Sequence, residues 1–466
     1  IRTGISAVDV AGAKGNLAAE VTGWDFAGVA AAARQAWQKR LEVVSAEAAD
    51  SALLRVFYTA LYHTMIAPNL YHDIDGRYRG TDGGIHTDEE FTNYTVFSLW
   101  DTYRAAHSLF TITAPELVPD FINTMLTVRE QQGKLPVWSL AGNETNCMIG
   151  YHAVPVIADA VRKKIPGFDY EAALEAAVHS ASLDFRGLDH YRNFGYIPSE
   201  LENESVAKTM EYCIDDWCIS QMASDMGRQD LASRFMERSR NYRNLFDTTL
   251  LFVRGRMSDG SWRPDYDPLY SHHTRSDFTE GNGWQYTWLA PHDVDGLISL
   301  FGGKEIFLER LDSLFTVNEE VKGENRSPDI SGLIGQYAHG NEPSHHIAYL
   351  FTMAGAPERT EVMVRRIMDE MYTDEVDGIC GNEDCGQMSA WYVFSALGFY
   401  PVNPADGHFI IGSPVLDKAS VTVPGGKLFT VVAEGNSPSA VKVSSLFLNG
   451  RSEEHTSELQ SHHDLV

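Results

Sequence analysis

The segment at residues 206–226 reads VAKTMEYCIDDWCISQMASDM, and a second segment at residues 230–251, DLASRFMERSRNYRNLFDTTLL, follows shortly after it. Neither contains proline or glycine, and both repeat apolar side chains at the spacing of a helix face. Segments of this kind, each about 10 to 20 residues long, recur from about residue 26 to about residue 374, separated by loops rich in Gly, Pro, Asn, Asp, His and Trp. The other expected helices cover residues 29–47, 52–67, 95–110, 115–132, 170–182, 344–354 and 359–371.

No parallel-strand pattern alternates with these helices, so their apolar stripes must pack against one another. This predicts a mainly α fold of the α/α barrel type over residues 24–398. Beyond it, short β-branched runs punctuated by Pro and Gly predict a β-rich C-terminal region over residues 399–450, which breaks off. Residues 1–23 are rich in Gly and Ala with short alternating segments, which predicts the end of a truncated N-terminal β domain and a linker.

The final stretch, residues 451–466, reads RSEEHTSELQSHHDLV and has no apolar period. Its first part resembles the conceptual translation of a common sequencing-library adapter. We therefore expect this tail to be a sequencing-adapter artefact, which is to be excluded from reasoning about the fold, and a natural polar tail is the alternative.

Composition excludes several classes of protein. The 466 residues include 64 Asp and Glu against 37 Lys and Arg, a formal net charge of −27. A nucleic-acid binder needs a basic face to displace counterions, so we expect no nucleic-acid partner. No run of about 18 apolar residues occurs, which predicts no membrane span. The 5 cysteines are too few for a disulfide framework.

One acidic side chain stands in an aromatic loop at residues 277–288, DFTEGNGWQYTW. Aromatic faces cover the C–H surface of a sugar ring while amides and carboxylates bind its hydroxyls. Burial among Trp284, Tyr286 and Trp288 would raise the pKa of Glu280, as a proton donor requires at neutral pH. Glu280 is therefore the first catalytic candidate, and the alternative is a helix N-terminal carboxylate above core rings.

Two further loops offer oxygen ligands. Residues 381–392, GNEDCGQMSAWY, place Glu383 and Asp384 just before an apolar helix, where they cap it or hold a water or a metal. Residues 339–346, HGNEPSHH, place Asn341 and Glu342 together, and their oxygens suit a hard cation such as calcium. The alternative for the second loop is that Ser344 caps the helix that follows it.

Other polar and aromatic loops surround these candidates. Asp101 beside Arg104 indicates either a sugar clamp or a buried ion pair. Tyr212, Asp215 and Trp217 are further candidates for the mouth of the same site.

Taken together, the clusters resemble glycoside hydrolase family 92, the calcium-dependent exo-acting α-mannosidases. The resemblance covers about residues 24–450 and is carried by the following motifs: LWDTYR at 99–104, AGNETNCMIGYHA at 141–153, TEGNGWQYTW at 279–288, HGNEPSHH at 339–346 and GNEDCGQMSAWYVFSALGFYPV at 381–402. It implies an (α/α)6 catalytic barrel behind an N-terminal β-sandwich, of which this chain keeps a remnant.

The resemblance also implies an inverting mechanism that releases terminal α-mannose from mannose-containing glycans outside the cytoplasm. Glu280 is the expected general acid and Asp384 the general base, with Glu383 or Asn382 as its neighbour. The family uses Ca²⁺ on the O2 and O3 hydroxyls of the sugar, and the expected ligands are Asn341, Glu342 and Gln285. The expected substrate-binding residues are Trp100, Asp101, Arg104, Asn143, Glu144, Trp284 and His339.

Two other functions share these features. A different inverting (α/α)6 glycosidase would keep the acid and the base but need no metal. A catalytically silent glycan-binding protein would keep the aromatic loops, although it has no need for an acid and a base on opposite faces of a sugar.

Overall fold

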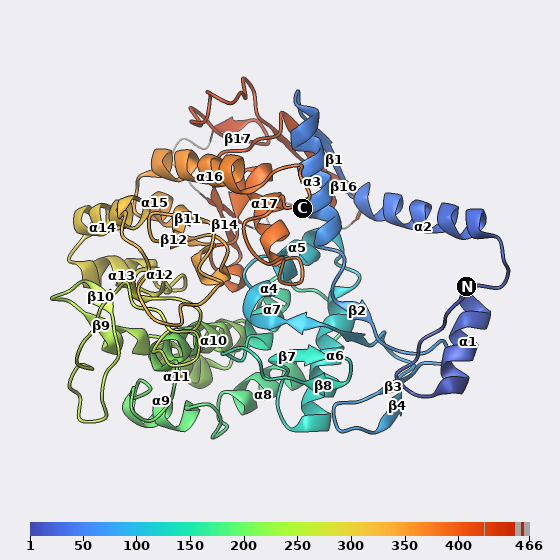
Figure 1. Ribbon diagram of the computed structural model, residues 1–466, viewed down its shortest axis with the longest axis horizontal. Helices are drawn as coiled ribbons and strands as arrows, with labels where there is room; N and C mark the ends of the chain where they lie inside the picture. The colour runs from blue at the N-terminus through green and yellow to red at the C-terminus, as the bar shows by residue number, and fades with distance from the viewer. Residues whose placement is uncertain (424, 453–457, 461–466) are drawn as a thin grey trace.

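The computed structural model describes residues 1–423, 425–452 and 458–460 (Figure 1). Its α-helices are α1 (Val10–Glu20), α2 (Phe26–Leu41), α3 (Ser51–His63), α4 (Leu99–Thr102), α5 (Ala106–Thr113), α6 (Val118–Gln132), α7 (Ala153–Arg162), α8 (Tyr170–Ser180), α9 (Leu188–Phe194), α10 (Ser205–Asp225), α11 (Gln229–Arg238), α12 (Gly283–Tyr286), α13 (Val294–Phe301), α14 (Lys304–Thr316), α15 (Leu350–Met353), α16 (Pro357–Met371) and α17 (Gln387–Leu397).

The strands are short and lie mostly between helices or near the C-terminus. They are β1 (Val44–Glu47), β2 (Asn69–Leu70), β3 (Arg77–Arg79), β4 (Ile85–Thr87), β5 (Tyr94–Thr95), β6 (Phe97–Ser98), β7 (Trp138–Leu140), β8 (Asn143–Glu144), β9 (Phe246–Asp247), β10 (Phe252–Val253), β11 (Leu333–Ile334), β12 (Tyr337–Ala338), β13 (Phe399–Tyr400), β14 (His408–Ile411), β15 (Lys418–Val423), β16 (Lys427–Val432), β17 (Phe447–Leu448), β18 (Arg451–Ser452) and β19 (Glu458–Gln460).

The helices follow one another around a common core. In Figure 1 the colour passes from blue α3 through cyan α6, green α10 and yellow α14 to orange α17, which lies beside α3 again. One hydrophobic cluster runs through the helices from α3 to α17, with members from Val44 to Val421. The mainly helical fold predicted from the apolar spacing is therefore confirmed.

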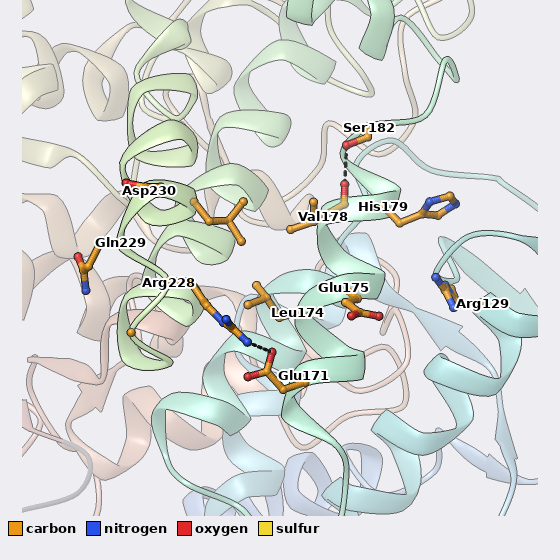
Figure 2. A pocket seen from close by; sticks show the side chains of 12 residues that line it. Arg129, Glu171, Leu174, Glu175, Val178, His179, Ser182, Arg228, Gln229 and Asp230 are labelled. Carbon is orange, nitrogen blue, oxygen red and sulfur yellow. Dashed lines mark hydrogen bonds and ion pairs between the residues drawn. The ribbon is translucent and has the colours of Figure 1, made fainter.

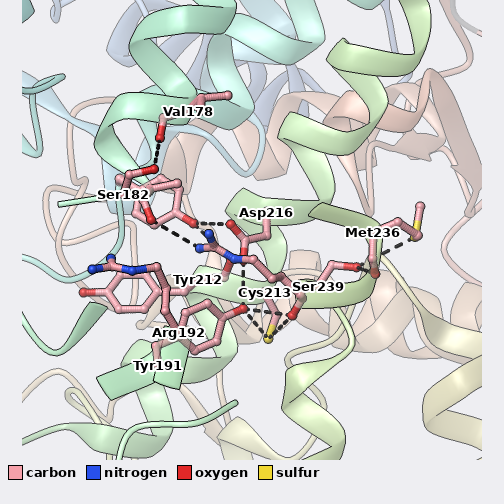
Figure 3. Close-up of polar contacts among 12 residues, drawn as sticks. Val178, Ser182, Tyr191, Arg192, Tyr212, Cys213, Asp216, Met236 and Ser239 are labelled. Carbon is pink, nitrogen blue, oxygen red and sulfur yellow. Dashed lines mark hydrogen bonds and ion pairs between the residues drawn. The ribbon is translucent and has the colours of Figure 1, made fainter. Parts of the chain in front are cut away.

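Buried polar contacts fix the central helix α10. Asp216, fully buried, accepts hydrogen bonds from the hydroxyl of Tyr191 at 2.9 Å and from Nε of Arg238 at 2.8 Å (Figure 3). Tyr151 donates a third bond to the other carboxylate oxygen at 2.6 Å. Because an ion pair inside a core must be satisfied on every side, these contacts fix the position of α10 relative to its neighbours.

The C-terminal region is β-rich, as predicted. Strand β1 pairs antiparallel with β15, with Val44 opposite Val421, and β15 pairs with β16. Residues near the start of the helical region are thus joined to residues near the end. Of the tail predicted to be an artefact, residues 451–466, positions 453–457 and 461–466 lie outside the described residues, and β19 pairs with β14. That residues 451–466 derive from a sequencing adapter remains a prediction.

Several predicted boundaries were wrong. Within residues 1–23 the structure has helix α1, capped by the Asp9 side chain on the Gly12 amide, instead of strands. The helix expected over residues 29–47 ends at Leu41, because the β-branched residues after it pair with β15.

Two other expected helices are interrupted. The helix expected over residues 95–110 is broken into α4 and α5, because Oε1 of Gln387 accepts the amide protons of Ala105 and Ala106, each at 3.0 Å. The helix expected over residues 230–251 gives way to a 3-10 turn at Asn241–Leu245 and then to β9. Within the part of the chain that the structure describes, no helix has the length and apolarity to span a membrane.

Candidate active site

Glu280 lies in the loop that enters α12. Its backbone has φ of 49°, in the left-handed region, and its carbonyl accepts a hydrogen bond from Nδ2 of Asn341 at 2.8 Å. Two residues later, Asn282 and Gln285 form a reciprocal capping box at the start of α12. The acid therefore sits on a backbone fixed by its own helix and by the loop of residues 339–346.

The environment of Glu280 suits a proton donor. Burial, together with the negative charges of Asp329 and Asp384, raises the pKa of its carboxyl group to about 8. At neutral pH the group is therefore protonated. The rings predicted to cover a sugar instead pack into the core: Trp284 meets Phe252 edge-on at 4.8 Å between ring centroids, and Trp288 stacks on Phe301 at 5.2 Å.

Asp384 faces this acid from the loop before α17. Its backbone φ is 46°, and its charge is among those that raise the pKa of Glu280. Burial raises the pKa of Asp384 itself, while a hydrogen bond from Glu342 favours its charged form. Glu280 and Asp384, predicted from separate motifs, are therefore brought into electrostatic contact across one site.

Asp384 belongs to a cluster of three carboxylates. One oxygen from each of Asp101, Glu342 and Asp384 lies within 4.8 Å of the other two. Asp101 also accepts a hydrogen bond from Ser98, and its burial and the charge of Asp384 raise its pKa well above the usual value. Burial, with the charges of Asp101 and Asp384, raises the pKa of Glu342 in the same way. We call these three residues the carboxylate cluster.

The carboxylate cluster fits a calcium ion, and it contains one of the three ligands predicted from the sequence, Glu342. Oε1 of Glu342 is buried and has no hydrogen-bond partner, and all three side chains offer the hard oxygen donors that calcium prefers. Of the other predicted ligands, Gln285 uses both ends of its amide, accepting from the Asn282 amide at 2.9 Å and donating to the Gln336 carbonyl at 2.9 Å. Asn341 donates to Glu280.

Glu383, predicted to assist the base, bonds away from the carboxylate cluster. Its oxygens accept from the amide of Ser389 at 3.0 Å and from the hydroxyl of Ser389 at 2.8 Å, and Nδ1 of His63 lies 3.0 Å away. These contacts join the loop to α17 and α3. The capping alternative considered for this motif accounts for the Ser389 contacts.

Two of the predicted substrate-binding residues, Trp100 and Arg104, are buried next to each other. Arg104 is buried, with Nη2 at 2.5 Å from Oε1 of Glu211, and its guanidinium stacks over Trp100 at 5.3 Å from the ring centroid. The buried ion pair, one of the two readings of this motif, is thus present, although its partner is Glu211 and not Asp101. The indole Nε1 of Trp100 is buried without a partner.

The prediction for His339 was wrong. Its side chain is fully buried, and its two ring nitrogens bond the hydroxyls of Tyr337 and Tyr372, each at 2.7 Å. Both ring nitrogens already have partners inside the protein, so the ring has no nitrogen to offer a sugar hydroxyl. Asn143 and Glu144 lie in the hairpin of β7 and β8, where Glu144 accepts the amides of Val137 and Trp138 and Asn143 is exposed.

Sequence reasoning missed two residues beside the acid. His273 and Asp329 each place a ligand atom within 4.8 Å of Glu280 and of each other. Both stand in long loops without a recognisable motif, and only the fold brings them to Glu280. Tyr212 and Asp215, candidates for the mouth, are buried on α10, where Asp215 bonds Nδ1 of His152 at 2.7 Å.

A surface hollow of about 920 Å³ lies elsewhere, between α6, α8 and α11 (Figure 2). It is lined by apolar side chains such as Leu174 and by an exposed ion pair between Glu171 and Arg228 at 2.9 Å. It contains no Trp or Tyr on which a sugar ring would stack and none of the predicted site residues.

A carboxyl group that is protonated at neutral pH, with a second carboxylate near enough to raise its pKa, is the kind of pair that glycoside hydrolases use. A family model described as the glycosyl hydrolase family 92 catalytic domain matches residues 12–466. The chain therefore belongs to glycoside hydrolase family 92.

Solved structures agree with this assignment. A family GH92 α-mannosidase from Bacteroides thetaiotaomicron, in complex with mannoimidazole, is 43% identical with a TM-score of 0.94, covering 98% of this chain and 60% of its own. A family GH92 inverting mannosidase from the same organism is 35% identical with a TM-score of 0.88, covering 99% of this chain and 64% of its own.

A curated relative, an uncharacterized secreted glycosidase of Arthroderma benhamiae, is 27% identical over 92% of this chain and 54% of its own length. The chain thus spans between about half and two thirds of the length of these relatives.

Proposed function

We propose that this chain carries the catalytic region of an inverting, exo-acting α-mannosidase that removes terminal α-mannose from mannose-containing glycans with the help of Ca²⁺. The observation that carries the proposal is the pairing of Glu280, whose pKa is raised to about 8, with Asp384 across the site. The mannoimidazole complex of one similar α-mannosidase supports the substrate class, and the similarity to an inverting mannosidase supports the stereochemistry. The passage of helices from α3 round to α17 supports an (α/α)6 barrel.

In the proposed reaction Glu280 donates its proton to the glycosidic oxygen as the bond to the leaving sugar breaks. Asp384 takes a proton from a water molecule that attacks the anomeric carbon from the opposite face. Room for that water requires roughly 6.5–9.5 Å between the two carboxyl groups, and the product is β-mannose. The hydrogen bond from Glu342 favours the charged form of Asp384, which the base requires.

The residues of the carboxylate cluster, Asp101, Glu342 and Asp384, would hold the calcium ion. When bound, calcium supplies positive charge that polarises sugar hydroxyls and stabilises charge in the transition state. The same charge would offset the repulsion among the three carboxylates. Trp100 and Asp101 are the proposed contacts of the terminal mannose. We also propose action outside the cytoplasm, in line with the secreted glycosidase that resembles this chain.

The test is release of mannose from linkage-defined α-mannobiosides, followed by proton NMR, with and without a calcium chelator. The proposal predicts β-mannose as the first product, loss of release with the chelator, recovery on adding Ca²⁺, and no release by Glu280→Gln. Release that resists the chelator would support a metal-free inverting glycosidase. Glycan binding without release by the wild-type protein would support a glycan-binding protein, and α-mannose as the first product would contradict inversion.

A further inference from the structure

The loop that carries Asp384 is held in an unusual backbone conformation. Three consecutive residues have positive φ: Asp384 at 46°, Cys385 at 56° and Gly386 at 92°. Non-glycine residues avoid this region, so they persist in it only where the surroundings fix them. The contacts that fix this loop therefore also fix the direction of the Asp384 carboxylate.

Glu383 supplies those contacts from inside the loop. Oε1 accepts the Ser389 amide proton at 3.0 Å, and Oε2 accepts both the Ser389 hydroxyl at 2.8 Å and Nδ1–H of His63 at 3.0 Å. Both carboxylate oxygens are engaged, Oε1 by α17 alone and Oε2 by both α17 and α3. Glu383 thus links helices α17 and α3, and it directly precedes the proposed base in the chain.

The end of α3 abuts the same loop. A Cβ added at Gly386 would lie 2.8 Å from Cα of Thr64, so the two backbones are already in contact. His63 is the last residue of α3, and its side chain is one-third exposed, at 33%. It lines a cavity of about 630 Å³ with Glu383 and Cys385, behind the loop. The His63 side chain therefore has room to turn away from Glu383, and the hydrogen bond between the two holds it in place.

We propose that His63 is a positioning residue that keeps the base Asp384 directed at its water by holding the Glu383 carboxylate. This inference rests on the proposed function, because it takes Asp384 as the base. His63 does not touch the reacting atoms. Its contribution is to the geometry of the water-activating half of the site and not to proton donation by Glu280.

The first test compares His63→Leu, which removes the donor, with His63→Asn, whose side-chain amide can replace Nδ1–H. His63→Leu should lower kcat about tenfold or more, since small misplacements of catalytic groups cost this much, with KM within about twofold. The loss should be equal on an α-mannobioside and on 2,4-dinitrophenyl α-mannoside, because a good leaving group removes the need for the acid but not for the base. His63→Asn should recover most of the activity.

His86→Leu is the matched control. His86 pairs with Asp82 at 2.9 Å with a similar exposure, 35%, in the β3–β4 hairpin, away from α3 and α17 (Figure 1). This variant should behave as wild type.

A second readout does not depend on activity. Hydrogen exchange followed by mass spectrometry should show about tenfold faster exchange in peptides covering residues 383–389 of His63→Leu, because the Ser389 amide is held by Glu383, while α10 stays unchanged. His63→Asn should match wild type. Unchanged exchange in this segment, or a kcat for His63→Leu within about twofold of wild type, would overturn the inference. Inactive wild-type protein with faster exchange in His63→Leu would instead count against the proposed function and leave the link through Glu383 supported.

Discussion

The side-chain amide of Asn341 donates from Nδ2 to the backbone carbonyl of Glu280 over 2.8 Å. Glu280 has φ of 49°, a conformation that costs a non-glycine residue about 1 to 3 kcal/mol and needs support from its surroundings. Asn341 is part of that support. The motif HGNEPSHH therefore contributes to the acid, besides supplying Glu342 to the carboxylate cluster.

Asn341→Ala should lower kcat on an α-mannobioside about tenfold, because the acid loses a fixed position. Asn341→Asp distinguishes the two roles of this residue. It keeps an oxygen for a metal but loses the donor, so it should be as impaired as Asn341→Ala and should not be rescued by added Ca²⁺. Asn244→Ala is the control, since Nδ2 of Asn244 makes the same kind of bond to the Gly195 carbonyl at 2.8 Å outside the site. Full activity of Asn341→Asp would refute the donor role.

The pKa of Glu280 sets the alkaline side of the pH profile. A general acid acts only while protonated, so kcat/KM on an α-mannobioside should fall as the pH rises through about 8. On 2,4-dinitrophenyl α-mannoside, whose leaving group needs no proton, this fall should be absent. Steady-state kinetics between pH 5 and 9, in constant Ca²⁺, measure kcat/KM for both substrates. The same alkaline fall with both would show that Glu280 is not the general acid.

The same shift has a consequence for stability. The folded-state pKa of Glu280, about 8, lies above the ordinary value of 4.5, so the folded protein holds a proton that the unfolded chain releases between these values. Stability from this group is present below pH 4.5 and is lost as the pH rises through about 8. Glu280→Gln should therefore raise the thermal unfolding midpoint at pH 8.5 and have little effect at pH 5. Calorimetry at both pH values tests this, and an equal shift at both would contradict it.

Much of the fold was predictable because most helices bury one face. Residues 115–132, 170–182 and 206–226 were placed to within a few residues of α6, α8 and α10. The failures occurred where a distant residue decides the local structure. The break between α4 and α5 depends on Gln387, far along the chain, which no local pattern reveals.

Site residues could be predicted where a motif also carries the expected chemistry. They could not be predicted where burial determines what a polar side chain does. Glu280 and Asp384 were chosen from their motifs, and the structure brings them together. His339 stands in an equally polar motif, yet it serves the aromatic core. The Asn282–Gln285 capping box was readable from its spacing and would have argued against Gln285 as a metal ligand.

Arg104 and Glu211 form an ion pair in which both side chains are nearly or wholly buried, at 6% and 0% exposure. Glu211→Ala leaves the guanidinium without its partner inside the core, which should lower the free energy of unfolding by about 3 to 5 kcal/mol. The exposed pair of Arg40 and Glu116 gives the comparison, and Glu116→Ala should cost less than about 1 kcal/mol. Equilibrium denaturation in urea measures both, and equal costs would contradict this account of the buried pair.

Calcium should stabilise the protein through the carboxylate cluster. Burial raises the pKa of all three carboxyl groups, of which Asp101 and Glu342 are buried and Asp384 is half-buried, and a divalent cation that binds them in the folded state alone shifts the unfolding equilibrium. At about 100 times the dissociation constant the gain is about 2.7 kcal/mol, so the unfolding midpoint should rise with Ca²⁺ and fall on chelation. Because bound carboxylates must release their protons, the shift should shrink as the pH falls.

Glu342→Gln is the deciding variant for this effect, because it replaces the buried oxygen that has no hydrogen-bond partner in the structure. The neutral amide cannot give up a proton to become a carboxylate ligand, as Glu342 can, so the Ca²⁺-induced rise in the unfolding midpoint should drop to a small fraction of the wild-type value. Glu89→Gln, at an exposed position, is the control and should keep the full calcium response. A response to Ca²⁺ that survives Glu342→Gln unchanged would place the ion elsewhere.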